Sequence, residues 1–104
     1  MIRSLCTEAH TTAREKGFHD DSPETPFDDP RYLLSLLMLI GTEVAEAAEE
    51  VRKGTPEGFA DELADICIRV FDVAGLCVID LEQAITAKMA ANRDRPHRHG
   101  GKRV

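Results

Sequence analysis

The junction at Gly54 constrains the fold of this 104-residue chain more than any other sequence feature. An amphipathic segment, residues 30–53, ends there, and glycine readily adopts the left-handed conformation that ends a helix. Thr55 and Pro56 then give the signal of a new helix, a polar N-cap followed by proline at the first helical position. The sequence therefore predicts two long antiparallel helices, residues 30–53 and 56 to about 76.

The chain before this hairpin predicts one shorter helix and one loop. Residues 2–16 form a helix that ends at Gly17. Residues 18–29 hold two prolines and five Asp or Glu residues, a composition typical of a loop. The loop ends in Asp29-Pro30, which again combines an N-cap with a first-position proline and so marks the start of the long helix.

After the hairpin, Asp80 and Gln83 form a capping-box pattern that starts a fourth helix. We expect this helix to continue to about Arg93, before the sequence DRPHRHGG breaks it. No alternating strand pattern is present. The predicted fold is all-α, a small four-helix bundle that forms one domain, residues 1–104, and a chain of this length is small enough that a partner subunit would help to stabilise it. Residues 94–104 are its basic C-terminal tail.

The formal net charge of −6 argues against general affinity for nucleic acid or for an anionic membrane. The three cysteines show no C-x-x-C spacing, which favours reduced thiols over disulfides or a zinc site. The N-terminus lacks the apolar run of a signal peptide, and YLLSLLMLIG is far shorter than the ~20 residues of a membrane span. We therefore expect a cytoplasmic protein without a membrane partner.

Two pairs of acidic residues lie at the edges of apolar helix faces. At about 100° per residue, Glu43 and Glu46 border the apolar stripe of the first long helix. Glu62 and Asp65 border the stripe of the second. Residues at i and i+3 lie on one side of a helix, so two such pairs on antiparallel neighbours place four carboxylates around one pocket.

Four carboxylates beside an apolar core repel one another, so either their pKa values rise or cations lie between them. Oxygen-only ligands suit Mg²⁺ and Mn²⁺, and no cysteine or histidine stands at zinc spacing. The alternative is an ordinary solvated face, because glutamate is a strong helix former. The pattern alone leaves both interpretations open.

The same residues carry a resemblance to a known family. Glu43-x-x-Glu46, fifteen intervening residues and Glu62-x-x-Asp65 resemble the Glu-x-x-Glu and Glu-x-x-Asp pattern of the MazG-like all-α nucleoside triphosphate pyrophosphohydrolases. The phrases EVAEAAEEVRKG and DELADICIRV are similar to the two core helices of that family. KMAANRDRPHRHGGK is similar to the ending of many small members, so the resemblance covers nearly the whole chain.

The resemblance implies hydrolysis of a nucleoside triphosphate to monophosphate and pyrophosphate, in the cleaning of nucleotide pools. It implies that Glu43, Glu46, Glu62 and Asp65 ligate Mg²⁺, or Mn²⁺, which neutralises the triphosphate and activates water. Glu46 or Glu62 would act as the general base. It also implies assembly as a homodimer or homotetramer in which a second subunit completes the bundle.

In the family that this chain resembles, residues that match two positions of the fourth helix approach the nucleotide. A third residue follows just beyond that helix. By this resemblance we assign phosphate contact to Lys88, sugar or base contact to Asn92 and phosphate contact to Arg95. Without it, Lys88 would be an exposed helix lysine and Asn92 a helix-terminal residue.

Arg69 lies one turn after Asp65. Some relatives carry an aromatic residue near the substrate at this position, so the resemblance implies a different recognition of the base here. The alternative is an ion pair of Arg69 with Asp65 or Asp72.

Two rival functions remain open from the sequence. The chain could be a non-catalytic helical interaction or regulatory module, in which the acids are surface charge. It could also be an enzyme of the same class that acts on a diphosphate or another nucleotide pyrophosphate.

Overall fold

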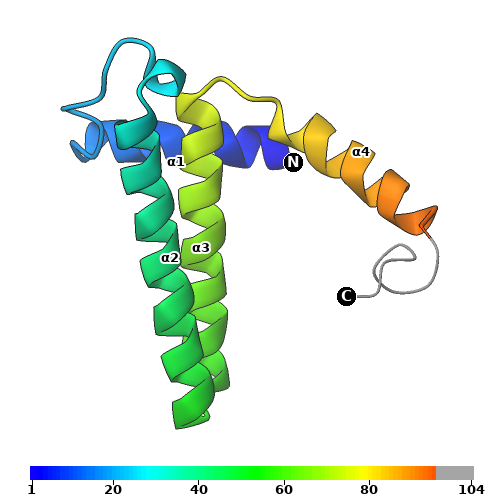
Figure 1. The fold of residues 1–104 in the computed structure, drawn as a ribbon. Helices are drawn as coiled ribbons and strands as arrows, with labels where there is room; N and C mark the ends of the chain where they lie inside the picture. Colours follow the sequence, from blue (N-terminus) through cyan, green and yellow to red (C-terminus); the bar gives the residue numbers. More distant parts are fainter. Residues whose placement is uncertain (96–104) are drawn as a thin grey trace.

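The computed structural model describes residues 1–95, and within this range the chain is helical without any strand. The elements are α1 (Ile2–Glu15), the short 3₁₀ helix η1 (Pro26–Asp28), α2 (Pro30–Lys53), α3 (Pro56–Leu76) and α4 (Leu81–Arg93) (Figure 1). The prediction of an all-α fold is confirmed, and each predicted helix is present with its bounds shifted by no more than one residue.

α2 and α3 form a long antiparallel hairpin (Figure 1). Asp29 caps α2, because its carboxylate accepts a hydrogen bond from the backbone N–H of Tyr32 at 3.2 Å. Gly54 ends α2 in the left-handed region, at φ 72° and ψ 39°, as the sequence predicts. Thr55 stands at the N-cap of α3, but its hydroxyl donates to the carbonyl oxygen of Glu50 at 3.3 Å. α3 therefore starts without the side-chain cap that the sequence predicts.

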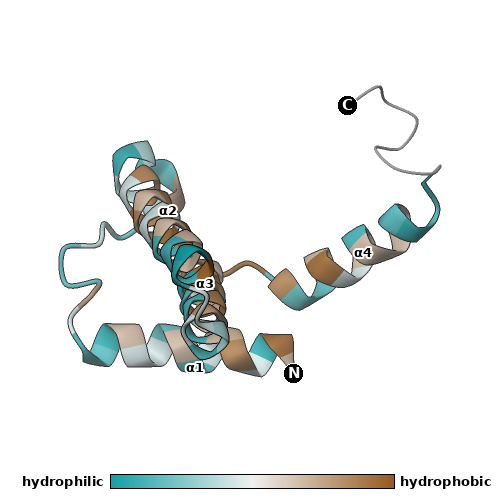
Figure 2. Ribbon diagram, turned by 90° about the horizontal axis from the view of Figure 1, so that it is seen from below, coloured by the Kyte–Doolittle hydropathy of each residue, from teal (hydrophilic) through white to brown (hydrophobic). Residues whose placement is uncertain are grey.

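α1 crosses one end of the hairpin and packs against α3 (Figures 1 and 2). The crossing depends on Gly75, where a Cβ atom would lie 2.5 Å from the Cβ of His10 and 3.1 Å from the carbonyl oxygen of Cys6. Any larger residue would push the two helices apart, because protein interiors have no room for such overlaps. Cys6 and Ala74 are buried in this part of the fold.

α4 packs against the start of α1 and extends away from α2 and α3 (Figure 1). The guanidinium of Arg3 joins the two helices, 3.1 Å from a carboxylate oxygen of Asp80 and 2.9 Å from one of Glu82. Asp80 also accepts a hydrogen bond from the backbone N–H of Gln83 at 3.1 Å, which confirms the predicted helix start. Residues 1–95 of one chain thus form four α-helices that do not close into a bundle.

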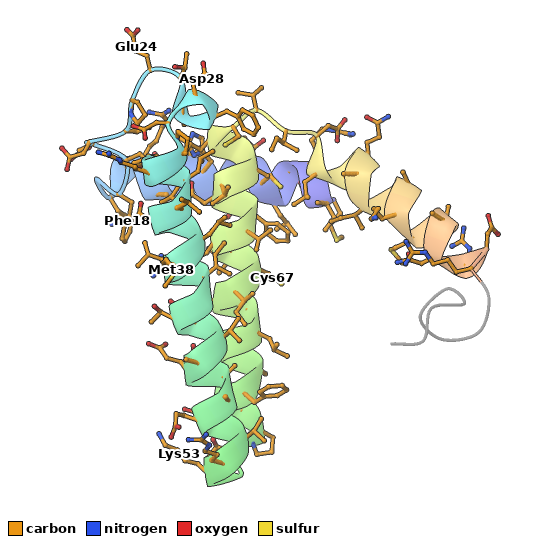
Figure 3. The ribbon with its side chains drawn as sticks, viewed as in Figure 1. Phe18, Glu24, Asp28, Met38, Lys53 and Cys67 are labelled. Atoms are coloured by element: carbon orange, nitrogen blue, oxygen red, sulfur yellow. The ribbon has the colours of Figure 1, made fainter. Side chains whose placement is uncertain are left out.

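Large apolar side chains are exposed along the hairpin, where Figure 2 shows extended hydrophobic colouring. They include Leu34, Leu37 and Met38 on α2, and Leu63 and Ile68 on α3. Figure 3 places Met38 and the exposed Cys67 at the outer surface of the hairpin. Covering such surface is favourable, so these residues support the prediction of a second subunit, which the molecular mass in solution would test.

The three cysteines, Cys6, Cys67 and Cys77, are free, as the sequence predicts. Within residues 1–95, no helix combines the length and the apolar character needed to cross a membrane.

Candidate metal centre

α2 and α3 bring together three of the four predicted metal ligands. One carboxylate oxygen from each of Glu43, Glu62 and Asp65 lies within 4.8 Å of the other two. Glu43 is buried, with 8% of its surface exposed, whereas Glu62 is half-buried and Asp65 is exposed. Since Glu62 and Asp65 share one side of α3, and Glu43 lies on the apolar edge of α2, the hairpin itself builds this carboxylate group.

Glu46, the fourth predicted ligand, lies outside this group of three. It is exposed on α2, one turn after Glu43. Its negative charge nevertheless contributes to a raised pKa of Glu62. Glu46 is therefore close enough to act on the group while remaining accessible to solvent.

Arg69 neutralises the most buried carboxylate. Its Nε–H donates a hydrogen bond to Oε1 of Glu43 at 2.8 Å, which joins α3 to α2. This bond outweighs the opposing effect of burial and lowers the pKa of Glu43, so that Glu43 stays ionised. The ion pair considered for Arg69 with Asp65 or Asp72 is thus replaced by one across the hairpin, because the facing helix offers a more buried carboxylate.

The pKa of Glu62 shifts in the opposite direction from that of Glu43. Burial is the largest of the effects that raise its pKa to about 7, and the neighbouring carboxylates of Glu43, Glu46 and Asp65 add to it. Like charges at close range disfavour the ionised form. Near pH 7 and without a cation, Glu62 is therefore only partly ionised.

Two buried oxygens of the group, Oε2 of Glu43 and Oε2 of Glu62, have no hydrogen-bond partner within residues 1–95. Buried polar atoms are almost always hydrogen-bonded, so two such oxygens in one carboxylate group are candidates for ligating a cation. Mg²⁺ and Mn²⁺ prefer oxygen ligands, and Mg²⁺ is commonly bound by a few carboxylates together with water and substrate phosphate. The residues present fit a hard divalent cation.

The raised pKa of Glu62 predicts how stability depends on pH. Between its ordinary pKa of 4.5 and the raised value of about 7, the folded chain keeps a proton on Glu62 that the unfolded chain releases. The free energy of unfolding should therefore fall as pH rises through this window. The lowered pKa of Glu43 changes the free energy of unfolding only below its ordinary value, pH 4.5.

Urea unfolding without metal, at about pH 5 and about pH 8, measures this loss. Glu62→Gln cannot ionise and should flatten the dependence, and added Mg²⁺ should restore stability to the wild-type protein at the higher pH. The same loss of stability in the variant and in the wild type would contradict the role of Glu62.

A cavity of about 580 Å³ lies beside the carboxylate group, between α1 and the hairpin. Its polar lining includes Glu43, Asp65 and Arg69. Apolar side chains from all three helices and from the loop complete the wall, among them Leu5, Ala9, Phe18 (Figure 3), Leu36, Leu39, Ile68 and Phe71. A cavity of this volume, apolar with a few polar groups, is typical of a small-molecule site.

A network around His19 joins three helices and the loop, and no sequence pattern indicated it. The Nε2 of His19 lies 2.8 Å from Oδ2 of Asp72, and its Nδ1 lies 2.7 Å from the hydroxyl of Tyr32. The Nδ1 of His10 lies 2.9 Å from Oδ1 of Asp72, and the Nε–H of Arg14 donates to Nε2 of His10 at 2.8 Å. These are metal-ligand types, but each ring nitrogen already has a protein partner. His19 and Asp72 also line the cavity, so the network fixes part of its wall.

The three predicted substrate contacts lie elsewhere. Lys88 and Asn92 are exposed on α4, and Arg95 is exposed just beyond it. None of them lines the cavity, and α4 extends away from α2 and α3 (Figure 1). One chain does not bring these residues to its own carboxylate group, and their role stays a prediction. The remainder of the predicted basic tail, residues 96–104, lies outside the described residues.

Fold and site together define a small all-α protein with a group of clustered carboxylates between two antiparallel helices, beside a ligand-sized cavity. The family model of the MazG nucleotide pyrophosphohydrolase domain matches residues 31–99, more than half of the chain, and the chain belongs to this family. The match covers α2, α3 and α4 and leaves α1 outside it. Searches of curated proteins and of solved structures gave no match.

Proposed function

We propose that this protein hydrolyses a nucleoside triphosphate between its α and β phosphorus atoms and releases nucleoside monophosphate and pyrophosphate. Family membership supports hydrolysis of a nucleotide pyrophosphate bond. The observation that supports a cation-dependent reaction on a bound small molecule is the pair of buried oxygens on Glu43 and Glu62 without a partner in residues 1–95, beside a cavity of ligand size. Cleavage between the α and β phosphorus atoms rests on the family resemblance. The corresponding cellular role is the cleaning of cytoplasmic nucleotide pools.

The cation in this proposal is Mg²⁺, or Mn²⁺ in its place, held by Glu43, Glu46, Glu62 and Asp65. When bound, Mg²⁺ supplies positive charge that offsets the triphosphate and makes water more acidic. The chain itself keeps Glu43 ionised through Arg69 and crowds its carboxylates closely enough that an added cation relieves their repulsion.

Glu46 has a second role in this proposal: one of its two carboxylate oxygens ligates the cation, and the other acts as the general base. Because Glu46 is exposed and lies outside the group of three, its carboxylate can reach a water molecule and accept its proton. Oε1 of Glu43, by contrast, is already engaged by Arg69. Glu62 remains the second candidate for this role.

The nucleoside binds in the cavity under α1, where apolar side chains can contact the base. Lys88, Asn92 and Arg95 contact the nucleotide from α4 of a neighbouring subunit in a homodimer or homotetramer, since α4 of the same chain does not line the cavity. Nucleic acid is not a partner, because the net charge of −6 disfavours a polyanion.

Product analysis tests the reaction. With Mg²⁺ and a panel of canonical and modified nucleoside triphosphates, we expect equal amounts of monophosphate and pyrophosphate from at least one substrate, and none after chelation of the metal. Orthophosphate as the first product, or turnover of diphosphates alone, would contradict cleavage at the α phosphorus.

Calorimetry separates the enzyme from a non-catalytic helical module. An enzyme of the proposed kind should bind Mg²⁺ and a non-hydrolysable triphosphate analogue. A chain that binds neither would be a helical interaction module with a charged surface.

A further inference from the structure

We propose that Arg69 is a positioning residue that holds Glu43 in the orientation in which it ligates the cation. This inference rests on the proposed function, because Glu43 is a cation ligand only in that proposal. Arg69 lies on α3 and Glu43 on α2, 26 residues apart, and the Nε–H of Arg69 meets Oε1 of Glu43 at 2.8 Å. The two residues also line the cavity together.

The two oxygens of Glu43 have different environments. Oε1 accepts the hydrogen bond from Arg69, whereas the buried Oε2 has no partner. A carboxylate held at one oxygen cannot turn freely, so Oε2 is the atom left for a cation. Carboxylate ligands in metal sites are themselves hydrogen-bonded, and losing such a partner typically costs about 10- to 100-fold in metal affinity or activity.

The charge of Arg69 is a separate matter from its hydrogen bond. The guanidinium stays positive at any working pH and offsets one of the clustered carboxylates. That positive charge also repels an incoming cation. A test of positioning must therefore remove the charge in every variant that it compares.

Arg69→Gln and Arg69→Met provide that comparison. Both are neutral and extend equally far along the side chain, and the amide nitrogen of glutamine stands where Nε of arginine stood. Only the Gln variant keeps a donor for Glu43. Because the Arg69 side chain is 35% exposed, either substitution should leave the fold intact, which far-UV circular dichroism would check.

We expect the Met variant to bind Mg²⁺ about 10-fold more weakly than the Gln variant, or worse, when titrated calorimetrically without nucleotide. Equal Mg²⁺ affinities of the two variants would overturn the inference. Wild-type protein that binds no Mg²⁺ would instead overturn the proposed function. The titration measures affinity rather than turnover, so the two failures remain distinguishable.

Discussion

Glu62→Gln, and separately Asp65→Asn, should reduce Mg²⁺-dependent triphosphate hydrolysis by more than about 100-fold. Each change removes a negative charge from a group whose ligand atoms lie within 4.8 Å of one another. The loss should exceed the roughly 10- to 100-fold cost of removing the hydrogen-bond partner of a metal ligand. Initial rates of pyrophosphate release at fixed Mg²⁺ concentration measure this effect.

Glu49→Gln is the matched control for these variants. Glu49 lies on the same helix as Glu43, with its side chain 54% exposed and paired to Arg52 at 2.7 Å, away from the carboxylate group. It should retain wild-type turnover, since an exposed ion pair of this kind contributes little. Full turnover in Glu62→Gln or Asp65→Asn, with the helices intact, would remove the metal assignment.

The helices could be predicted because their ends are defined by neighbouring residues. Asp29, Gly54 and Asp80 act through contacts within one turn of the chain, and the structure has the predicted contact at each. The path of α1 across the hairpin depends instead on Gly75, which approaches Cys6 and His10 from another helix. The residues next to Gly75 in the sequence do not indicate this contact.

In the candidate site, too, contacts set by local periodicity could be predicted and tertiary contacts could not. Glu43, Glu62 and Asp65 could be placed together because helical periodicity and one short turn suffice to bring them into a group. The partner of Arg69 could not be predicted, since periodicity offered Asp65 and Asp72 on its own helix and the real partner lies on another. The position of α4 away from the cavity is likewise a tertiary property that no local pattern contains.

His19→Leu should cost about 3 kcal/mol of folding stability, a large share of the roughly 5–15 kcal/mol typical of a domain. The His19 side chain is 1% exposed, and it links Asp72 of α3 to Tyr32 of α2. Leucine is similar in size, so the loss comes from polar groups left without a partner rather than from an empty space. The midpoint of urea unfolding measures it.

Tyr32→Phe should cost only about 1 kcal/mol, because it removes one hydroxyl and leaves the contact of His19 with Asp72 in place. The order of the two costs is the informative result. If His19→Leu destabilises no more than Tyr32→Phe, the network does not hold the loop and α1 against the hairpin. In the proposed function the nucleoside binds in the cavity whose wall includes His19 and Asp72, so loss of the network should also disturb that wall. Binding of the triphosphate analogue should then weaken in His19→Leu even at temperatures where the variant remains folded.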